Sequence, residues 1–489
     1  MVLHGKRSAR CRLAKIEKMK NKIFLILLSL ITVFGLFLRL IDYDKVPPPE
    51  EDFDELHYAW GGSSWIVEGT PRSWSYLSSY EKYEYIESHG IRWRIVSPLI
   101  EKPPFYFLLN GVILNFLSKG DIFSIEHNKI RILPIALGTV SIFLTGVVAA
   151  GIFTKQVGLL AAFLYSIVPT IVLANRMNVT EALLTPFALL ITYFLTKSSF
   201  VRRINLFTIV IGIISSLAVL TKQIGLALPL SAFIFFLLRK QWKSLFIILG
   251  FVILSFVLIF LVGWVYDLEL FLKLMNDLRV HTLAGLPETI LSIFRYPGIS
   301  AKNRPFYDGT ILASWILFFT AGFWMASLIG DKNKGITKSK TFLLLILPFT
   351  YLSLIVLGES GSGAFNYFGR YVFPLFPYLM VVFALFIFRI WKRPGFFEVL
   401  FLLLFLGSST IRFLFLNFPR QYHYLWQNSL LLLGILLLVF WPLGLKVRRF
   451  LLLFYFLIFV LVNLIVDIRL LNLYGPSVEQ SQRILELFN

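Results

Sequence analysis

Apolar segments close to 20 residues long recur along the whole chain, separated by short polar and basic stretches. A helix needs about 20 apolar residues to cross a hydrocarbon core roughly 30 Å thick. No segment shows the alternating polarity of a membrane β-barrel. The pattern predicts an all-α polytopic membrane protein with about 13 transmembrane helices, at residues 23–41, 131–152, 159–175, 182–196, 204–221, 224–238, 244–264, 309–329, 341–358, 371–390, 396–416, 429–445 and 450–466.

One further apolar segment, Pro103–Ser118, predicts an interfacial helix rather than a membrane span. Gly111, Asn115 and Ser118 recur at helical spacing and form a polar stripe opposite a large apolar face. A helix of this kind lies in the membrane interface. A second amphipathic stretch is predicted near Leu268–Val280.

The loops orient these spans. Basic residues cluster in every second loop, which the positive-inside rule places in the cytoplasm. All clusters lie on one side only if Pro103–Ser118 does not cross the membrane. The clusters are Lys6–Lys22, Lys155, Lys197 with Arg202 and Arg203, Arg239 with Lys240 and Lys243, Lys332–Lys340, Lys392 with Arg393, and Lys446–Arg449.

This topology gives a cytoplasmic N-terminus and two long outer loops, 42–129 and 266–307. We expect a basic cytoplasmic tail at 1–22, a membrane core at 23–390 with amphipathic interfacial helices in its first outer loop, and additional transmembrane helices with a short outer tail at 391–489.

Composition argues against two function classes. The formal net charge is +20, but the basic residues lie between membrane spans, so nucleic acid is not an expected partner. The span interiors carry almost no ionisable groups, which weighs against an ion-coupled carrier. A lipid flippase stays open, because it needs only a groove.

The first outer loop is acidic. Residues 50–55 contain five carboxylates in six positions, and on a short helix Asp54 shares a face with Tyr58. This cluster is either a solvated acidic loop or a functional one that supplies a general base, a divalent-cation site, or both.

Several basic residues lie on the outer face against the charge rule. Arg131, Arg176, Lys222 and Arg370 are donors of the kind that a phosphate site at the membrane surface needs. For each of these residues taken alone, the alternative to phosphate binding is snorkelling, in which the apolar stem lies along the membrane and the charged end reaches water.

The motifs that hold these residues occur in a recognisable order. They are Asp54-Glu55 followed by Tyr58, Glu101-Lys102-Pro103-Pro104, Arg131-Ile132-Leu133-Pro134 with Gly138, the stretch from Arg176 to Glu181, Lys222, and Arg370-Tyr371 with Pro374 and Pro377. From about residue 23 to 390 this set resembles the membrane glycosyltransferases with the C-type fold, closest to the superfamily of protein O-mannosyltransferases and lipid A aminoarabinose transferases.

The resemblance implies a polyprenyl-phosphate sugar donor and a lipid, glycan or protein acceptor at the outer surface of the plasma (inner) membrane. It implies that Asp54 is the base, with Glu55 in support. The second acidic position is usually Asp and here is Glu181, whose longer side chain puts its role in question. The implied donor phosphate ligands are Lys102, Arg131, Arg176, Lys222 and Arg370.

The resemblance also implies a possible cofactor. Some members of the superfamily bind a metal through the glutamate of the Lys-Pro motif, which makes Glu101 a candidate ligand for Mg²⁺, Mn²⁺ or Zn²⁺. His281, in the second outer loop, is a second candidate, although a lone loop histidine is more often simply solvated.

The expected activity is an inverting hexosyl- or pentosyltransferase whose active site is extracytoplasmic. Two other classes remain open. A lipid-linked glycan flippase shares the topology but does not need Asp54, and an oligosaccharide ligase or polymerase shares the chemistry but takes a longer donor. A structural scaffold gives no reason for outer-face cations beside carboxylates.

Overall fold

The computed structural model describes residues 2–47, 53–118, 120–198, 206–280, 309–327, 340–359, 369–401 and 444–468, with a few isolated residues between 428 and 442. Arg202, Arg203, His281, residues 402–416 of one predicted span and most of 429–445 lie outside the described residues. The described chain is mostly helical. Its long helices are α1 (Val2–Leu40), α5 (Ile132–Ile152), α6 (Lys155–Ile167), α8 (Thr180–Ser198), α9 (Leu206–Thr221), α10 (Ala227–Leu238), α11 (Trp242–Tyr266), α14 (Gly309–Ser327), α15 (Lys340–Glu359), α16 (Phe376–Lys392) and α19 (Leu445–Ile468).

Five of the described helical stretches are long and apolar enough to cross a membrane. They are Met19–Leu40, His127–Ile152, Trp242–Tyr266, Arg370–Lys392 and Leu445–Ile468. Other apolar helices are shorter. The predicted span 159–175, for example, divides into α6 and α7 (Pro169–Ala174), because a proline cannot donate the backbone hydrogen bond that would continue α6. The protein is a multi-pass membrane protein, and the number of about 13 spans stays a prediction.

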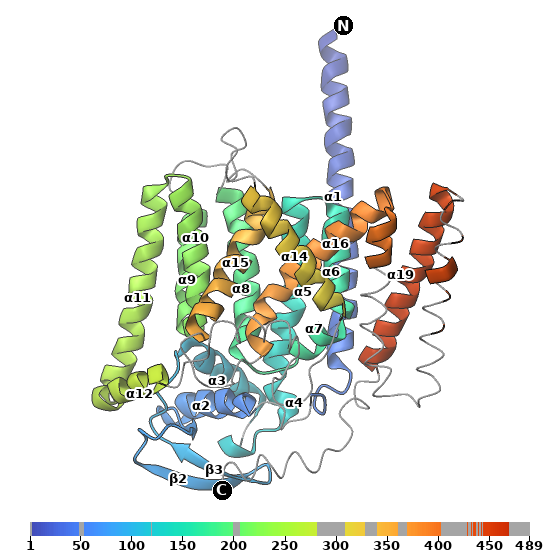
Figure 1. Cartoon of the computed structure of the whole chain (residues 1–489). Coiled ribbons are helices and arrows are strands. Elements are labelled where there is room, and N and C mark those ends of the chain that lie inside the picture. The colour runs from blue at the N-terminus through green and yellow to red at the C-terminus, as the bar shows by residue number, and fades with distance from the viewer. Residues whose placement is uncertain are drawn as a thin grey trace.

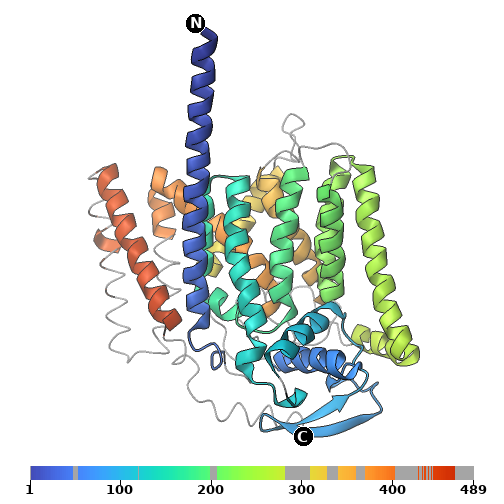
Figure 2. The same cartoon turned by 180° about the vertical axis from the view of Figure 1, so that it is seen from behind.

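The molecule has two layers (Figures 1 and 2). The long helices form a bundle, and α16 packs deep inside it while α11 lies largely exposed at its edge. At the end of the bundle opposite the N-terminus lies a second layer. This layer contains α2 (Asp54–Glu68), α3 (Phe105–Leu117), α4 (His127–Ile130), α12 (Leu268–Val280) and a small sheet. Helices α3 and α12 thus occur where the two amphipathic segments were predicted.

Helices α2 and α3 touch backbone to backbone. A Cβ atom added at Gly62 would lie 2.2 Å from the carbonyl oxygen of Phe107, and one added at Gly111 would lie 2.1 Å from that of Gly62. Only glycine leaves room for this approach. The contact fixes the start of α2 beside the residues that precede α3.

Gly62→Ala is therefore expected to destabilise the second layer by about 1–3 kcal/mol, because the methyl group has no space without moving a backbone. The matched control is Gly250→Ala in α11, where nothing lies within 4 Å of the added Cβ. Thermal unfolding of the purified variants in detergent measures the effect. Equal midpoints for the two variants would contradict the tight contact.

The first outer loop also contains a three-stranded antiparallel sheet, which the all-α expectation missed. The strands β1 (Ser73–Trp74), β2 (Tyr83–Ser88) and β3 (Ile91–Val96) run in the order β1-β3-β2. The register of β2 and β3 extends from Tyr83 opposite Val96 to Ser88 opposite Ile91.

A tight turn and an alternating strand explain this sheet. His89 and Gly90 both have positive φ angles, 51° and 75°, as the two-residue turns of twisted hairpins require. In β3, Ile91, Trp93 and Ile95 are buried while the residues between them are more exposed. The period of two was present in the sequence but spans only six residues beside far stronger apolar runs.

The segment with Tyr266 and α12 packs on the layer that contains α2. The hydroxyl of Tyr266 donates to the carbonyl oxygen of Gly69 at 2.8 Å. On α12, the carboxylate of Asp277 accepts hydrogen bonds from the backbone N–H and the hydroxyl of Ser79. Helix α12 is therefore fixed against the layer that contains α2 and α3.

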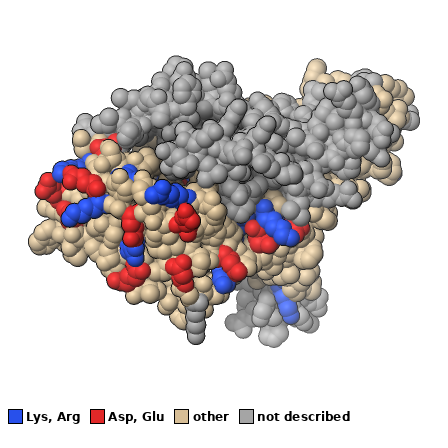
Figure 3. All heavy atoms as spheres, turned by 90° about the horizontal axis from the view of Figure 1, so that it is seen from below, with Lys and Arg blue, Asp and Glu red and all other residues tan. Residues whose placement is uncertain are grey.

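The described surface of the second layer carries charges of both signs. Figure 3 shows basic and acidic side chains interleaved over the second layer. Many of them pair locally, as Lys129 does with Glu126 at 3.5 Å and Lys273 with Glu269 at 3.0 Å. Such pairs neutralise one another, so the charges that distinguish this face are those enclosed between the layers.

Candidate functional site

Helix α2 begins with two adjacent carboxylates that have different surroundings. Successive helical residues point about 100° apart. The side chain of Asp54 is 14% exposed, whereas that of Glu55 is 1% exposed. Asp54 therefore lies where a ligand can reach it, whereas Glu55 points into the protein.

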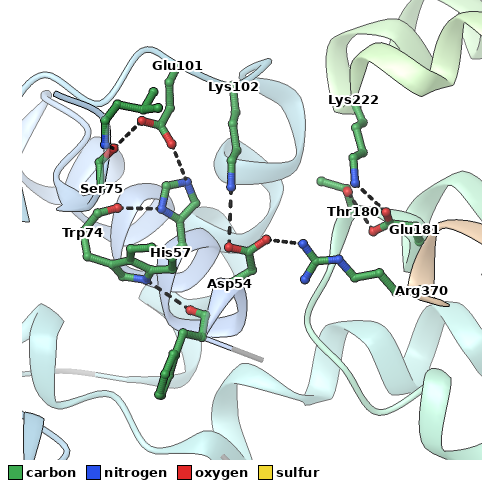
Figure 4. A network of polar contacts seen from close by, with 12 residues as sticks. Asp54, His57, Trp74, Ser75, Glu101, Lys102, Thr180, Glu181, Lys222 and Arg370 are labelled. Carbon is green, nitrogen blue, oxygen red and sulfur yellow. Dashed lines mark hydrogen bonds and ion pairs between the residues drawn. The ribbon is translucent and has the colours of Figure 1, made fainter. Parts of the chain in front are cut away.

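Asp54 lies between two cations that come from distant parts of the chain (Figure 4). The Arg370 Nη2 atom donates to Asp54 Oδ2 at 2.5 Å, and the Lys102 Nζ atom lies 3.6 Å from Oδ1. Lys102 precedes α3, and Arg370 lies in the short helix η5 (Gly369–Leu375) that leads into α16. The fold thus unites three of the predicted site residues.

These cations decide the charge state of Asp54. Burial by itself would raise the pKa of its carboxyl group, but Lys102 and Arg370 outweigh burial and hold the pKa well below its usual range. Asp54 is a carboxylate at any physiological pH, and it is a weak base while both cations stay in contact with it.

A second carboxylate–cation pair lies beside the first. The Lys222 Nζ atom donates to Glu181 Oε1 at 2.5 Å, and the Thr180 hydroxyl donates to Oε2 at 3.0 Å. The same Nζ atom lies 4.1 Å from the ring centre of Tyr371. Lys222 is positioned by the extended backbone that ends α9, with φ −163° and ψ 149°. Burial lowers the pKa of Lys222.

Tyr58 lies between the two pairs. It is one turn from Asp54 on α2, and its ring faces Lys102 Nζ at 5.1 Å from the ring centre. Burial raises the pKa of its hydroxyl well above the usual value, and the charges of Asp54 and Glu181 raise it further. Tyr58 is therefore a neutral hydroxyl that can donate a hydrogen bond within the site.

Glu55 and Arg131 form an internal ion pair instead. Arg131 Nη2 donates to Glu55 Oε2 at 2.7 Å, and Nη1 donates to the backbone oxygens of Tyr43 and Pro47 at 2.8 and 2.7 Å. Glu55 also accepts from the backbone N–H of Asn178 at 2.8 Å. These contacts join α2 to the outer ends of the bundle helices.

Arg176 has similar surroundings. Its guanidinium donates to the backbone oxygens of Leu38 and Val46, at 2.8 and 3.1 Å, and the side chain is fully buried. The donor phosphate contacts expected for Arg131 and Arg176 stay predictions. Their described hydrogen bonds hold the chain that leaves α1.

Glu101, the candidate metal ligand, lies in a small buried network on the other side of Asp54 (Figure 4). Its Oε2 atom accepts from the Ser75 hydroxyl at 2.6 Å, and its Oε1 atom lies 3.9 Å from His57 Nε2. Burial raises the pKa of Glu101. Burial and the charge of Lys102 lower the pKa of His57 to about 3, so His57 is neutral.

This network does not by itself form a metal site. Among the described residues, no group of three or more His, Cys, Asp or Glu side chains is placed to hold a metal ion. Glu101 and His57 would supply two ligands, fewer than the three protein ligands of typical catalytic zinc sites. The other candidate, His281, lies outside the described residues.

Sequence reasoning did not single out His57. It lies three residues after Asp54, so both belong to one helical face, and this spacing was the available signal. Its Nδ1 atom lies 2.9 Å from the carbonyl oxygen of Trp74, to which it donates. That contact connects α2 to β1 and steadies the helix that presents Asp54.

The central part of the chain also matches a known family. Residues 102–266 match the family described as dolichyl-phosphate-mannose-protein mannosyltransferase. This segment is about a third of the 489 residues, and it includes three of the six quoted motifs whole and all but Glu101 of a fourth, but neither Asp54 nor Arg370. The superfamily resemblance inferred from the sequence is confirmed by this match, which supports glycosyl transfer from a lipid-linked donor.

Solved structures that this chain matches come from Archaeoglobus fulgidus. Its oligosaccharyltransferase in the apo form has a TM-score of 0.46 and 13% identity, covering 77% of this chain and 51% of that one. The complex with Zn and sulfate has a TM-score of 0.44 at 14% identity, with coverages of 77% and 51%. The enzyme AglB with an inhibitory peptide and a dolichol-phosphate has a TM-score of 0.47 at 14% identity, with coverages of 80% and 55%.

This chain thus spans about half the length of those proteins. No curated protein matches it.

Proposed function

We propose that this protein is a glycosyltransferase that moves a sugar from a polyprenyl-phosphate donor to an acceptor at the extracytoplasmic face of the plasma (inner) membrane. The observation that carries the proposal is the Asp54 carboxylate between Lys102 and Arg370, beside the Glu181–Lys222 pair. A carboxylate among cations at the end of a helical bundle provides a base together with ligands for a phosphate.

The family match supports this donor class. The description of that family names a dolichyl-phosphate sugar, in which a polyprenyl chain carries a sugar through one phosphate. The lipid part of such a donor is confined to the bilayer, which supplies part of the proximity that the reaction needs. The phosphate must then lie at the membrane surface, where the second layer meets the bundle.

The proposed reaction is one displacement with inversion. Asp54 takes the proton of an acceptor hydroxyl, and the acceptor oxygen forms a bond to the anomeric carbon. The bond from that carbon to the phosphate oxygen breaks, and its electron pair leaves with the lipid phosphate. A positioned base contributes about 10²- to 10⁴-fold to the rate.

The cations stabilise the leaving group. As the phosphate gains negative charge, preorganised donors nearby lower the barrier. Arg370 and Lys222 are the main candidates, with Lys102 in the same cluster. For Arg131, Arg176 and Glu55 we infer a supporting role, in which they hold α2 and the surrounding chain in place.

The orientation has support from the shape of the molecule. The N-terminus and the layer with α2, α3 and α12 lie at opposite ends of the bundle (Figures 1 and 2). The basic N-terminal tail is expected in the cytoplasm by the positive-inside rule. The site then faces the opposite compartment.

The test is sugar transfer by the purified protein in lipid. A panel of radiolabelled polyprenyl-phosphate monosaccharides is offered with a membrane extract as acceptor. Transfer from one of them identifies the sugar. Turnover of lipid-linked oligosaccharides alone would support a ligase. Movement of labelled lipid between leaflets without any transfer would overturn the enzyme and favour a flippase.

In this assay Arg370→Gln is expected to lower kcat/KM by about 10²- to 10³-fold, the effect of removing a donor that meets developing charge. The matched control is Lys273→Gln, which removes a half-exposed cation on α12 and is expected to transfer normally. Equal rates for both variants would exclude Arg370 from the phosphate site.

A further inference from the structure

Two of the three cations proposed to bind the donor phosphate, Arg370 and Lys102, are already bound to the proposed base. Asp54 uses both carboxylate oxygens, one toward Arg370 at 2.5 Å and one toward Lys102 at 3.6 Å. Two cations in contact with this carboxylate make it a weak base toward an acceptor hydroxyl. In the protein without donor, Asp54 therefore binds the same two cations, Arg370 and Lys102, that the donor phosphate would bind.

We propose that the phosphate of the donor displaces Asp54 from Arg370 and Lys102, and that this exchange releases Asp54 to act as the base. The inference rests on the proposed function and extends it to the order of events. The donor binds first, and the acceptor is activated only once the donor phosphate is in place.

The charges of the site favour such an exchange. Asp54 with its two cations and Glu181 with its one cation make five charged groups. The cations are Lys102, Arg370 and Lys222, and the carboxylates are Asp54 and Glu181. Three minus two leaves one net positive charge. A polyprenyl-phosphate sugar is a phosphodiester with one negative charge, so these five groups together with the donor are neutral.

The reaction then moves charge without changing its total. The acceptor proton goes to Asp54 and removes one negative charge there. The bond between the anomeric carbon and the phosphate oxygen breaks, and the departing phosphate gains one negative charge. Arg370 and Lys102 compensate the carboxylate before the exchange and the phosphate after it.

Exposure distinguishes Asp54 from the other carboxylate. The Asp54 side chain is 14% exposed and that of Glu181 is 0% exposed. Glu181 also keeps hydrogen bonds from Lys222 and Thr180. Lys102 is also more exposed than Lys222, at 27% against 17%, so we expect the incoming phosphate to reach the cations of Asp54 first while Glu181 continues to hold Lys222.

Carbodiimide labelling tests the exchange, because a hydrophobic carbodiimide reacts with a protonated carboxyl group. The wild-type protein in lipid is labelled at mildly acidic pH, with and without saturating polyprenyl monophosphate, and Asp54 is quantified by peptide mass spectrometry. Asp277 on α12, which binds Ser79, is the internal reference. Binding of radiolabelled polyprenyl monophosphate is measured on the same preparation.

We expect the lipid phosphate to increase labelling of Asp54 about tenfold for a rise of one in its pKa, with Asp277 unchanged. Binding of the lipid with unchanged or reduced labelling of Asp54 would overturn the exchange but leave the proposed function standing. Failure of the lipid to bind would overturn both. Inorganic phosphate at the same concentration is expected to have no effect, and an equal effect would overturn the assignment to a lipid donor.

Discussion

Asp54→Asn is expected to lower sugar transfer by about 10²- to 10⁴-fold, the contribution of a positioned base. The asparagine side chain has the same shape, and its amide oxygen can still accept a hydrogen bond from Arg370. It cannot take a proton from the acceptor. The loss is expected in the chemical step, so single-turnover transfer with bound donor should fall as much as steady-state transfer.

Folding of this variant is expected to change little. Asp54 is partly exposed at the first turn of α2, and Arg370 keeps the nearby charge of Glu181. The matched control is Glu126→Gln, which removes an exposed carboxylate that pairs with Lys129 at the surface of the second layer. It should transfer normally. Near-normal transfer by Asp54→Asn would show that another group is the base.

Glu55→Gln, one residue further along α2, is expected to lose activity because the protein folds less stably, and not because a catalytic group is missing. Arg131 is fully buried, and its charge is compensated by Glu55. Removing one partner of a buried ion pair costs about 3–5 kcal/mol, because the remaining charge stays in a region of low polarity. We expect a low yield of folded protein and a clearly lower midpoint of thermal unfolding.

A double variant separates this cause from a catalytic one. In Glu55→Gln with Arg131→Met no buried charge is left without a partner, so part of the stability should return. The recovery is partial because Arg131 also binds the backbone at Tyr43 and Pro47. A Glu55→Gln variant that folds normally but transfers slowly would instead assign Glu55 to the reaction.

The contrast between these two neighbours could not be read from the sequence. Both were acidic residues of one motif, and the resemblance gave Glu55 a supporting place in catalysis. The partner of Glu55 is 76 residues away, and that of Asp54 is 316 residues away. Which carboxylate meets which cation depends on how the helices pack, and local spacing contains no information on that.

The sequence was most informative where a physical pattern is long and regular. Apolar runs predicted the helices of the bundle, and the polar stripes at Pro103–Ser118 and Leu268–Val280 predicted α3 and α12. The small sheet was not predicted, because buried and exposed residues alternate over only the six residues of β3. The ordered motifs indicated the superfamily and gathered Asp54, Lys102, Glu181, Lys222 and Arg370 as candidates.

By itself, then, the sequence determined a helical membrane protein, its two amphipathic helices α3 and α12 and a set of candidate residues with the chemistry of phosphate and proton transfer. Hydrophobic periodicity fixes these features, because it acts within one helix at a time. Only the tertiary structure decided that Arg131 and Arg176 point into the protein, and that Arg370 and Lys102 hold Asp54. Those contacts join segments far apart in the chain, and they exist only when the two layers pack together.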